Sequence, residues 1–348
     1  MNSDQHRLLL PLIAFLLLST TVSHALAQWK TNQRKHELSW LQDEEIRRLV
    51  KLTDAQSIRA LLRPILVERQ VGTPQHDDVA NYLKTKVEEF GFTAEWDSFS
   101  AHTPMGVKSF HNLVATYDPL VHRRLVLACH YDSKIIPGKV FVGATDSALP
   151  CALLLDIAKT LGPMLAARTY QHITLQLVFL DGEEAFHEWT HLDSIYGARH
   201  LAGMLERKWY PSTDGSAFEL SREIDRIDVF MLLDLLGAKN PRIQSTFGHG
   251  TTALFEQLPF IEEQLGKMNV LNRIPRIFYY GTSFGAVEDD HIAFMKKGVP
   301  VLHLISVPFP PFWHTPGDNE SILDNATIEN LASILRVFVA RYLGIHPR

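Results

Sequence analysis

A largely apolar run from Leu175 to Leu180 ends in three acidic residues around one glycine, in the order Asp181, Gly182, Glu183, Glu184. Such a run, bounded by turn residues, is typical of a strand buried on both faces of a parallel sheet. Adjacent carboxylates at the end of a buried strand repel one another and lose hydration, so they need a positive partner, and a divalent metal ion is the simplest one. A solvated acidic turn that caps the next helix is the alternative interpretation.

Neighbouring side chains diverge on an extended backbone. We therefore expect only one of Glu183 and Glu184 to bind the metal directly, which leaves the other free to move protons.

Further apolar, β-branched-rich runs alternate with helical patterns along the chain, which predicts an α/β fold with a mostly parallel, helix-covered sheet. Helical packing is expected over residues 28–75, an amphipathic helix over 78–90 and an edge strand over 92–101. The predicted core strands cover residues 111–117, 124–130, 173–180, 227–236, 276–280 and 300–305, and the predicted helices cover 148–165, 197–207, 251–271 and 328–343. No linker or repeat divides residues 28–348, so we expect a single domain.

Polar clusters follow several of these runs, where parallel sheets collect ligands at the carboxyl ends of their strands. They are His130-Tyr131-Asp132, the acidic turn after Leu180, Asp234, and Trp313-His314. With Asp146, which lies in a glycine-containing approach to a helix, they supply the candidate metal ligands Asp146, Glu184 and His314. One imidazole and two carboxylates suit zinc and leave its fourth position open, as catalytic zinc requires. The alternatives are a helix N-cap for Asp146 and a surface or core histidine for His314.

The N-terminus is typical of a secretory signal peptide over residues 1–27. His6 and Arg7 precede the apolar run Leu8 to Leu18, and Ala25-Leu26-Ala27 forms an A-x-A cleavage signature. The apolar core is short for a membrane span, although an uncleaved anchor stays an alternative. We therefore expect a secreted protein with no stable membrane association after cleavage.

An oxidising compartment favours pairing of Cys129 with Cys151, the only two cysteines. Asn319 and Asn325 begin sequons that are possible glycosylation sites. A net charge of -5 with no block of Lys or Arg argues against a nucleic-acid partner.

Several segments together resemble the glutaminyl-peptide cyclotransferases, zinc enzymes that convert N-terminal Gln into pyroglutamate. The matching segments are LACHYDSK (127–134), FVGATDSALPCALLL (141–155), FLDGEEAF with Trp189, DSIYGARHLA (193–202), LLDLLGA (232–238), DDHIAFMKKGVPVLHLI (289–305) and PFPPFWHTPGDNE (308–320). The resemblance covers most of the chain after about residue 35. It implies a single α/β/α sandwich domain with a mostly parallel central sheet, like that of the zinc exopeptidases.

The same resemblance implies a role for each matching residue. It assigns one zinc ion per chain to Asp146, Glu184 and His314, and makes Glu183 the base that moves the proton. It further implies that Asp234 is a second catalytic carboxylate and that Asp289 and His303 form a hydrogen-bond network beside it. Trp189, Phe309 and Trp313 match the aromatic residues of the substrate pocket. Cys129 and Cys151 match the disulfide pair.

The implied substrates are peptides and proteins that begin with Gln, whose own α-amine attacks the γ-carboxamide. One rival is a zinc aminopeptidase of the same fold, because the ligand set of a two-zinc hydrolase is also present: His130, Asp146, Glu184, Asp234 and His314. The other is an inactive, receptor-like relative, against which the intact Glu183 and ligands argue.

Overall fold

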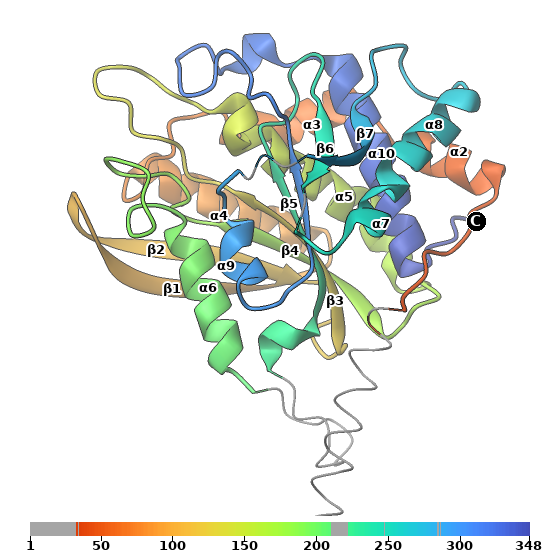
Figure 1. The fold of residues 1–348 in the computed structure, drawn as a ribbon, viewed down its shortest axis with the longest axis horizontal. Helices are drawn as coiled ribbons and strands as arrows, with labels where there is room; N and C mark the ends of the chain where they lie inside the picture. The colour runs from red at the N-terminus through yellow and green to blue at the C-terminus, as the bar shows by residue number, and fades with distance from the viewer. Residues whose placement is uncertain (1–32, 34, 210–221, 247, 284, 286) are drawn as a thin grey trace, which may run out of the picture.

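The computed structural model describes residues 33, 35–209, 222–246, 248–283, 285 and 287–348 (Figure 1). A six-stranded sheet has the order β1-β2-β4-β3-β5-β8, and a separate two-stranded sheet pairs β6 with β7. The strands are β1 (Thr93–Thr103), β2 (Gly106–Thr116), β3 (Arg123–His130), β4 (Ile173–Leu180), β5 (Ile227–Asp234), β6 (Ile243–Thr246), β7 (Phe278–Ser283) and β8 (Val301–Ile305).

The four strands β4, β3, β5 and β8 are parallel to one another, whereas β1 and β2 extend the sheet antiparallel beyond β4. His130 pairs with Leu180, and Asp234 pairs with Ile305, so the carboxyl ends of these four strands lie together on the same side of the sheet. The polar clusters that follow the strands therefore converge there. The predicted mostly parallel sheet and α/β/α sandwich are confirmed.

Alternation along β3 shows why helices cover both faces of the sheet. Leu125, Leu127 and Cys129 belong to the larger core, whereas Val126 and Ala128 point into a second core. The larger core also contains side chains from α2 (Asp43–Lys51), α3 (Ala55–Leu62), α4 (Pro74–Glu89), α5 (Leu149–Leu165), α7 (Thr252–Phe255), α8 (Gln257–Lys267) and α10 (Asn325–Leu343). The second core contains those of α6 (Tyr196–Arg207) and α9 (His291–Met295), which cover the opposite face in Figure 1.

Two elements differ from the prediction. The helix expected over 251–271 is divided into α7 and α8, with a break at Glu256. Pro259 has no N–H, so it cannot donate the backbone hydrogen bond that would continue one helix through the break. The strand expected over 276–280 is β7, which pairs with β6 in the small sheet and not in the central one. Strand β6 was not predicted, because its four residues are too few for a recognisable period.

The antiparallel edge is longer than expected, since β2 begins at Gly106 and pairs with β1 along its whole length. Its outer residues are mostly exposed and polar, so no apolar run marks them in the sequence. The predicted edge strand over 92–101 is confirmed as β1.

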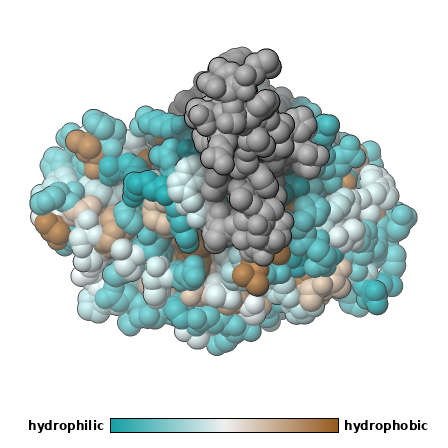
Figure 2. Space-filling view, turned by 90° about the horizontal axis from the view of Figure 1, so that it is seen from below, coloured by the Kyte–Doolittle hydropathy of each residue, from teal (hydrophilic) through white to brown (hydrophobic). Residues whose placement is uncertain are grey.

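The predicted signal peptide, residues 1–27, lies outside the described residues. By length and composition the helical stretch Ala144–Leu165 could span a membrane, but most of it is buried in the larger core. Asn319 is partly buried and caps a short helical turn, and Asn325 is exposed at the start of α10, so glycosylation stays a prediction. The end of the molecule seen in Figure 2 is mainly hydrophilic, with scattered apolar side chains among its described residues.

Candidate active site

Asp146, Glu184 and His314 converge at the carboxyl edge of the central sheet. His314 Nε2 lies 3.4 Å from Asp146 Oδ2 and 3.5 Å from Glu184 Oε1. Those two carboxylate oxygens are buried and have no hydrogen-bond partner within the described part of the chain. Ligand atoms around a tetrahedral zinc ion, each about 2.0–2.1 Å from it, are roughly 3.3 Å apart. The spacing, the chemistry of the three donors and the two orphaned oxygens all fit a metal ion.

The charge of this cluster also favours a cation. Burial alone would lower the pKa of His314, but Asp146 and Glu184 outweigh burial and raise it to about 9. Burial raises the pKa of Asp146, and its contacts with His130 and His314 reverse that effect and hold the pKa below its usual value. The site therefore attracts one positive charge, which a proton on His314 or a metal ion can supply.

Asp132, at the end of β3, fixes the acidic turn that follows β4. Its two carboxylate oxygens accept hydrogen bonds from the backbone N–H groups of Glu183 (3.1 Å) and Glu184 (3.2 Å). Gly182 has a positive φ of 68°, and a Cβ there would lie 2.4 Å from the ring of Phe110, so no other residue fits. The rigid backbone of the turn thus sets the direction of both glutamate side chains. Glu184 points toward Asp146 and His314, and these three candidate ligands are called the metal cluster below.

Glu183 is buried beside other carboxyl groups. Burial raises its pKa well above the ordinary value, and the negative charges of Glu184, Asp289 and Asp290 add to the rise. A carboxyl group with a raised pKa is a stronger proton acceptor than an ordinary surface glutamate, which suits it to a role in proton transfer.

Asp146 also faces a second group of side chains. His130 Nε2 lies 3.1 Å from Asp146 Oδ1 and 3.6 Å from Asp234 Oδ1, and these three residues could together hold a metal ion. Ser147 donates a hydrogen bond to Asp234 Oδ1 and orients it. Asp146 therefore presents one oxygen to His314 and the other to His130.

Asp289 and His303 form the predicted network pair, with His303 Nε2 2.6 Å from Asp289 Oδ2. Burial and the charge of Asp234 raise the pKa of Asp289 well above its usual value, whereas burial lowers the pKa of His303 to about 4. The imidazole of His291 lies tilted against that of His303 with ring centroids 4.1 Å apart, and the ring centroid of His249 is 4.9 Å from that of His291. Asp289, His291 and His303 are a third group that could hold a metal ion.

Two of the three predicted pocket aromatics lie beside the metal cluster. The Trp313 ring stacks on His314 with centroids 3.8 Å apart, and Phe309 packs edge-on against Trp313 at 4.8 Å. Trp189 is 37% exposed, and its indole N–H donates a 3.0 Å hydrogen bond to Glu288. The described contacts do not join Trp189 to the other two rings, so its place in a shared pocket stays a prediction.

Cys129 and Cys151 are both buried and face each other without a bond between their sulfur atoms in this structure, so the disulfide stays a prediction. Their sulfur atoms lie 2.9 Å apart, whereas a disulfide bond is about 2.05 Å long. Cys129 lies near the end of β3 and Cys151 in α5, and Cys151 Sγ also lies 3.2 Å from the backbone oxygen of His130.

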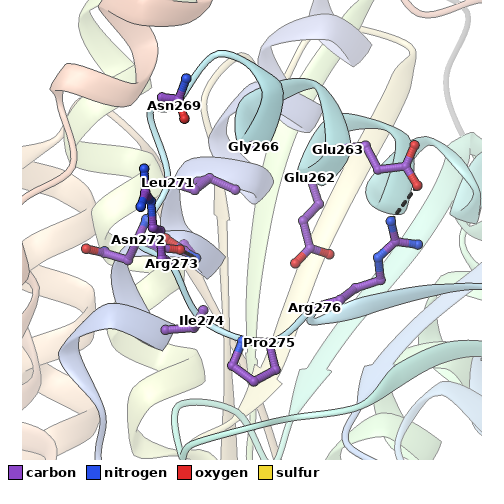
Figure 3. A pocket seen from close by; sticks show the side chains of 11 residues that line it. Glu262, Glu263, Gly266, Asn269, Leu271, Asn272, Arg273, Ile274, Pro275 and Arg276 are labelled. Carbon is purple, nitrogen blue, oxygen red and sulfur yellow. Dashed lines mark hydrogen bonds and ion pairs between the residues drawn. The ribbon is translucent and has the colours of Figure 1, made fainter.

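Two cavities are not lined by any of the three candidate ligands Asp146, Glu184 and His314. One of about 710 Å³ lies between α8 and the segment that leads to β7, and there Arg276 pairs with Glu263 (Figure 3). Its most buried acid, Glu262, accepts the backbone N–H groups of Ile277 and Phe278, both at 2.8 Å, and so has a structural role. The other, of about 890 Å³, is lined by Gln33, His36, His249 and Arg341 among others.

Several supporting residues were missed by reasoning from the sequence. Asp132 was noticed only as part of a polar cluster, and Ser147 and Lys134 received no role, although Lys134 Nζ lies 3.2 Å from Glu184 Oε2. Asp318 was missed too, and it accepts hydrogen bonds from the backbone N–H (2.9 Å) and the hydroxyl (3.0 Å) of Thr145. The available signal was proximity in the sequence to a strand end or to a candidate ligand.

Known proteins provide an independent view of this arrangement. The sequence profile of peptidase family M28 matches residues 112–339. A glutaminyl-peptide cyclotransferase-like protein of Bos taurus is 46% identical over 315 residues, which are 88% of this chain and 80% of that protein. The glutaminyl-peptide cyclotransferase of Drosophila melanogaster is 42% identical over 304 residues, 84% of this chain and 82% of its own.

A solved structure agrees with both. The crystal structure of Macrostomum lignano glutaminyl cyclase superposes with a TM-score of 0.82 at 36% sequence identity, covering 89% of this chain and 96% of that one. The similarity therefore extends through the sheet, the helices on both of its faces and the segments that carry the candidate site.

Proposed function

Because the chain belongs to peptidase family M28 and to the glutaminyl-peptide cyclotransferases, we propose that it is a zinc-dependent enzyme that cyclises N-terminal glutaminyl residues to pyroglutamate. The substrates are peptides and proteins that begin with Gln, and ammonia is released. One observation carries the proposal: three potential ligand atoms converge beside a buried glutamate whose pKa is raised.

Asp146, Glu184 and His314 would hold the zinc ion. Two carboxylates and an imidazole nearly cancel its charge and leave one position open, and bound zinc would supply Lewis acidity at the γ-carbonyl oxygen of the substrate. Lys134 contacts the other oxygen of Glu184 and helps to fix that carboxylate.

The reaction needs a proton carrier and no protein nucleophile. A C–N bond forms between the substrate's α-amine and its γ-carbonyl carbon, the bond to the amide nitrogen breaks, and one proton moves from the amine to the departing ammonia. Glu183 is suited to this transfer, because its raised pKa lets the carboxylate accept the proton and then return it.

Asp234 and Asp289 would orient the attacking amine. Burial and the charge of Asp234 raise the pKa of Asp289, which favours a proton shared between the two carboxyl groups over two full negative charges. His303 fixes Asp289, and Ser147 fixes Asp234. The carboxylate of Asp234 can then accept a hydrogen bond from the substrate amine without strong repulsion from its neighbour.

Trp189, Phe309 and Trp313 would enclose the glutamine side chain and exclude water. Phe309 and Trp313 support this role through their position, because Trp313 stacks directly on His314. Exclusion of water favours attack by the amine over hydrolysis of the amide.

An aminopeptidase is the second candidate function, favoured by the group formed by His130, Asp146 and Asp234. A second metal ion there would share Asp146 with the first, as in two-metal hydrolases. The two functions give different products from a peptide that begins with Gln. Mass spectrometry of the pure protein's products tests this: a cyclase releases ammonia and leaves the chain length unchanged, whereas an aminopeptidase releases a free amino acid.

We also propose entry into the secretory pathway, on the basis of the sequence of residues 1–27. N-terminal analysis of protein secreted from cultured cells tests cleavage after Ala27.

A further inference from the structure

Arg69 is a fully buried arginine, and within the described residues its guanidinium group donates only to backbone carbonyl groups. Nε donates to Tyr131 O at 2.7 Å, and Nη2 donates to Gly143 O and Asp146 O, each at 3.2 Å. The remaining acceptors, all of Nη1, are the carbonyl oxygens of Ile65, Val67 and Val142. In the described part of the chain no carboxylate lies within ion-pair distance of this guanidinium.

We propose that Arg69 is a positioning residue for the metal cluster, which holds the main chain of Asp146 in register with the end of β3. This inference rests on the proposed metal site but concerns a residue that touches neither metal nor substrate.

The geometry supports this role because Arg69 joins the two segments whose side chains meet at Asp146. Its backbone N–H donates to Ser133 Oγ at 2.9 Å, and its backbone oxygen accepts the N–H of Ser133 at 3.1 Å, just after His130 and Asp132. Through Nη2 the same residue holds the carbonyl groups of Gly143 and Asp146. A shift of the Asp146 main chain would change both of its contacts, with His130 and with His314.

The other side of the same segment is held by Asp318. Its carboxylate accepts two hydrogen bonds from Thr145, and its backbone oxygen accepts the N–H of Ala144 at 3.1 Å. Residues 143–146 are therefore clamped between a cation and an anion, so the position of the Asp146 carboxylate depends on both.

Arg69 also brings a positive charge close to several carboxylates. Burial lowers its pKa, and nearby Asp132, Asp146 and Asp318 act against that change. Arginine nevertheless stays protonated in proteins, so a fixed positive charge lies behind a cluster of carboxylates. Lysine would keep this charge, but its three donors cannot reach six carbonyl groups. Arg69→Lys therefore separates the hydrogen-bonding role from the charge.

Arg168 provides a matched control. It is also buried, and its guanidinium donates to the backbone oxygens of Ile173 (2.7 Å), Leu165 (2.9 Å) and Gln171 (3.2 Å). Unlike Arg69, it also has a carboxylate nearby, since its Nη2 lies 3.6 Å from Oδ2 of the partly exposed Asp118. The three backbone bonds lie where α5 leads into β4, at the opposite edge of the sheet from the metal cluster. Arg168→Lys thus reports what the loss of a buried guanidinium does to the fold alone.

The experiment compares wild type, Arg69→Lys and Arg168→Lys as full-length secreted proteins. Zinc affinity is measured by competition with a chromogenic chelator, and the visible spectrum is recorded after substitution by cobalt. We expect Arg69→Lys to weaken zinc binding by about 10- to 100-fold, as loss of partners that orient ligands generally does. The cobalt bands should also change, whereas Arg168→Lys should match wild type in both measurements even if both variants lose stability.

Unchanged zinc affinity and an unchanged cobalt spectrum in folded Arg69→Lys would overturn the positioning role. Wild type that binds no zinc would instead refute the proposed function, so the two failures can be told apart. If Arg69→Lys does not fold, Ser133→Ala replaces it, because this change removes only the hydroxyl that anchors the Arg69 backbone. We then expect zinc affinity to fall by about fivefold, as for one lost hydrogen bond, and no change would count against the proposal.

Discussion

Asp132 Oδ1 accepts a 3.1 Å hydrogen bond from the backbone N–H of Glu183. The other oxygen of Asp132 binds the N–H of Glu184, so a single carboxylate at the end of one strand fixes the turn at the end of the next. Although burial raises the pKa of Asp132, contacts with His130 and these two N–H groups outweigh it and lower that pKa. The position of both glutamates therefore depends on a residue that touches neither of their side chains.

Asp132→Ala should lower both stability and activity. It leaves two buried N–H groups without a partner, and each such group costs about 1–3 kcal/mol. Urea unfolding measures the loss. Asp132→Asn keeps one acceptor oxygen and should lose less, so equal stability of the two variants would show that these hydrogen bonds contribute little.

Glu183→Gln should keep the metal and substrate affinity but lower turnover by a factor of roughly 10² to 10⁴, the usual contribution of a general acid–base group. The substitution preserves shape and removes the titrating group. Metal content and steady-state kinetics on a Gln-initiated peptide check this prediction. Loss of zinc from this variant would mean that Glu183, and not Glu184, is the ligand.

His314→Ala should remove metal and activity together, because it deletes the only imidazole of the proposed ligand set. His130→Ala is the informative comparison, since His130 contacts Asp146 from the other side. We expect one zinc ion per chain in wild type and in His130→Ala by elemental analysis. Two tightly bound ions in wild type, one of which is lost in His130→Ala, would favour the aminopeptidase.

Cys129 and Cys151 should become linked when the protein is secreted through an oxidising compartment, because their sulfur atoms already lie 2.9 Å apart. The bond would close a loop of about twenty residues, for which chain entropy predicts roughly 3 kcal/mol of stabilisation. Thiol titration under denaturing conditions, before and after reduction, counts the free cysteines. Two reactive thiols in natively secreted, unreduced protein would contradict the pairing.

His36 should make stability depend on pH. Burial lowers its pKa from 6.5 to about 4, so between these values the unfolded chain binds a proton that the folded protein does not. The stability contributed by neutral His36 is therefore present above pH 6.5 and is lost as pH falls toward 4. Urea midpoints should fall less steeply over this range in His36→Gln than in wild type. Exposed His102→Gln is the control, and it should follow wild type.

Much of this site could be predicted from the sequence because its chemistry is local. The apolar run before Asp181 indicated a buried strand, and a buried strand that ends in carboxylates required a cation. The rule that ligands gather at the carboxyl ends of parallel strands then grouped Glu184, Asp234 and His314 without a structure, and Asp146 was added from its place before a helix. The resemblance to a known family added the individual roles, which composition and periodicity could not distinguish.

The tertiary structure decided how these residues contact one another. Asp146 directs one oxygen to His130 and the other to His314, and Arg69 and Asp318 hold its segment from opposite sides. The sequence places none of these contacts, because they join segments far apart in the chain and depend on rotamers and loop paths. For the same reason β7 pairs with β6 and not within the central sheet. Local pattern determined which residues are candidates for the chemistry, and only long-range packing determined their distances and pKa values.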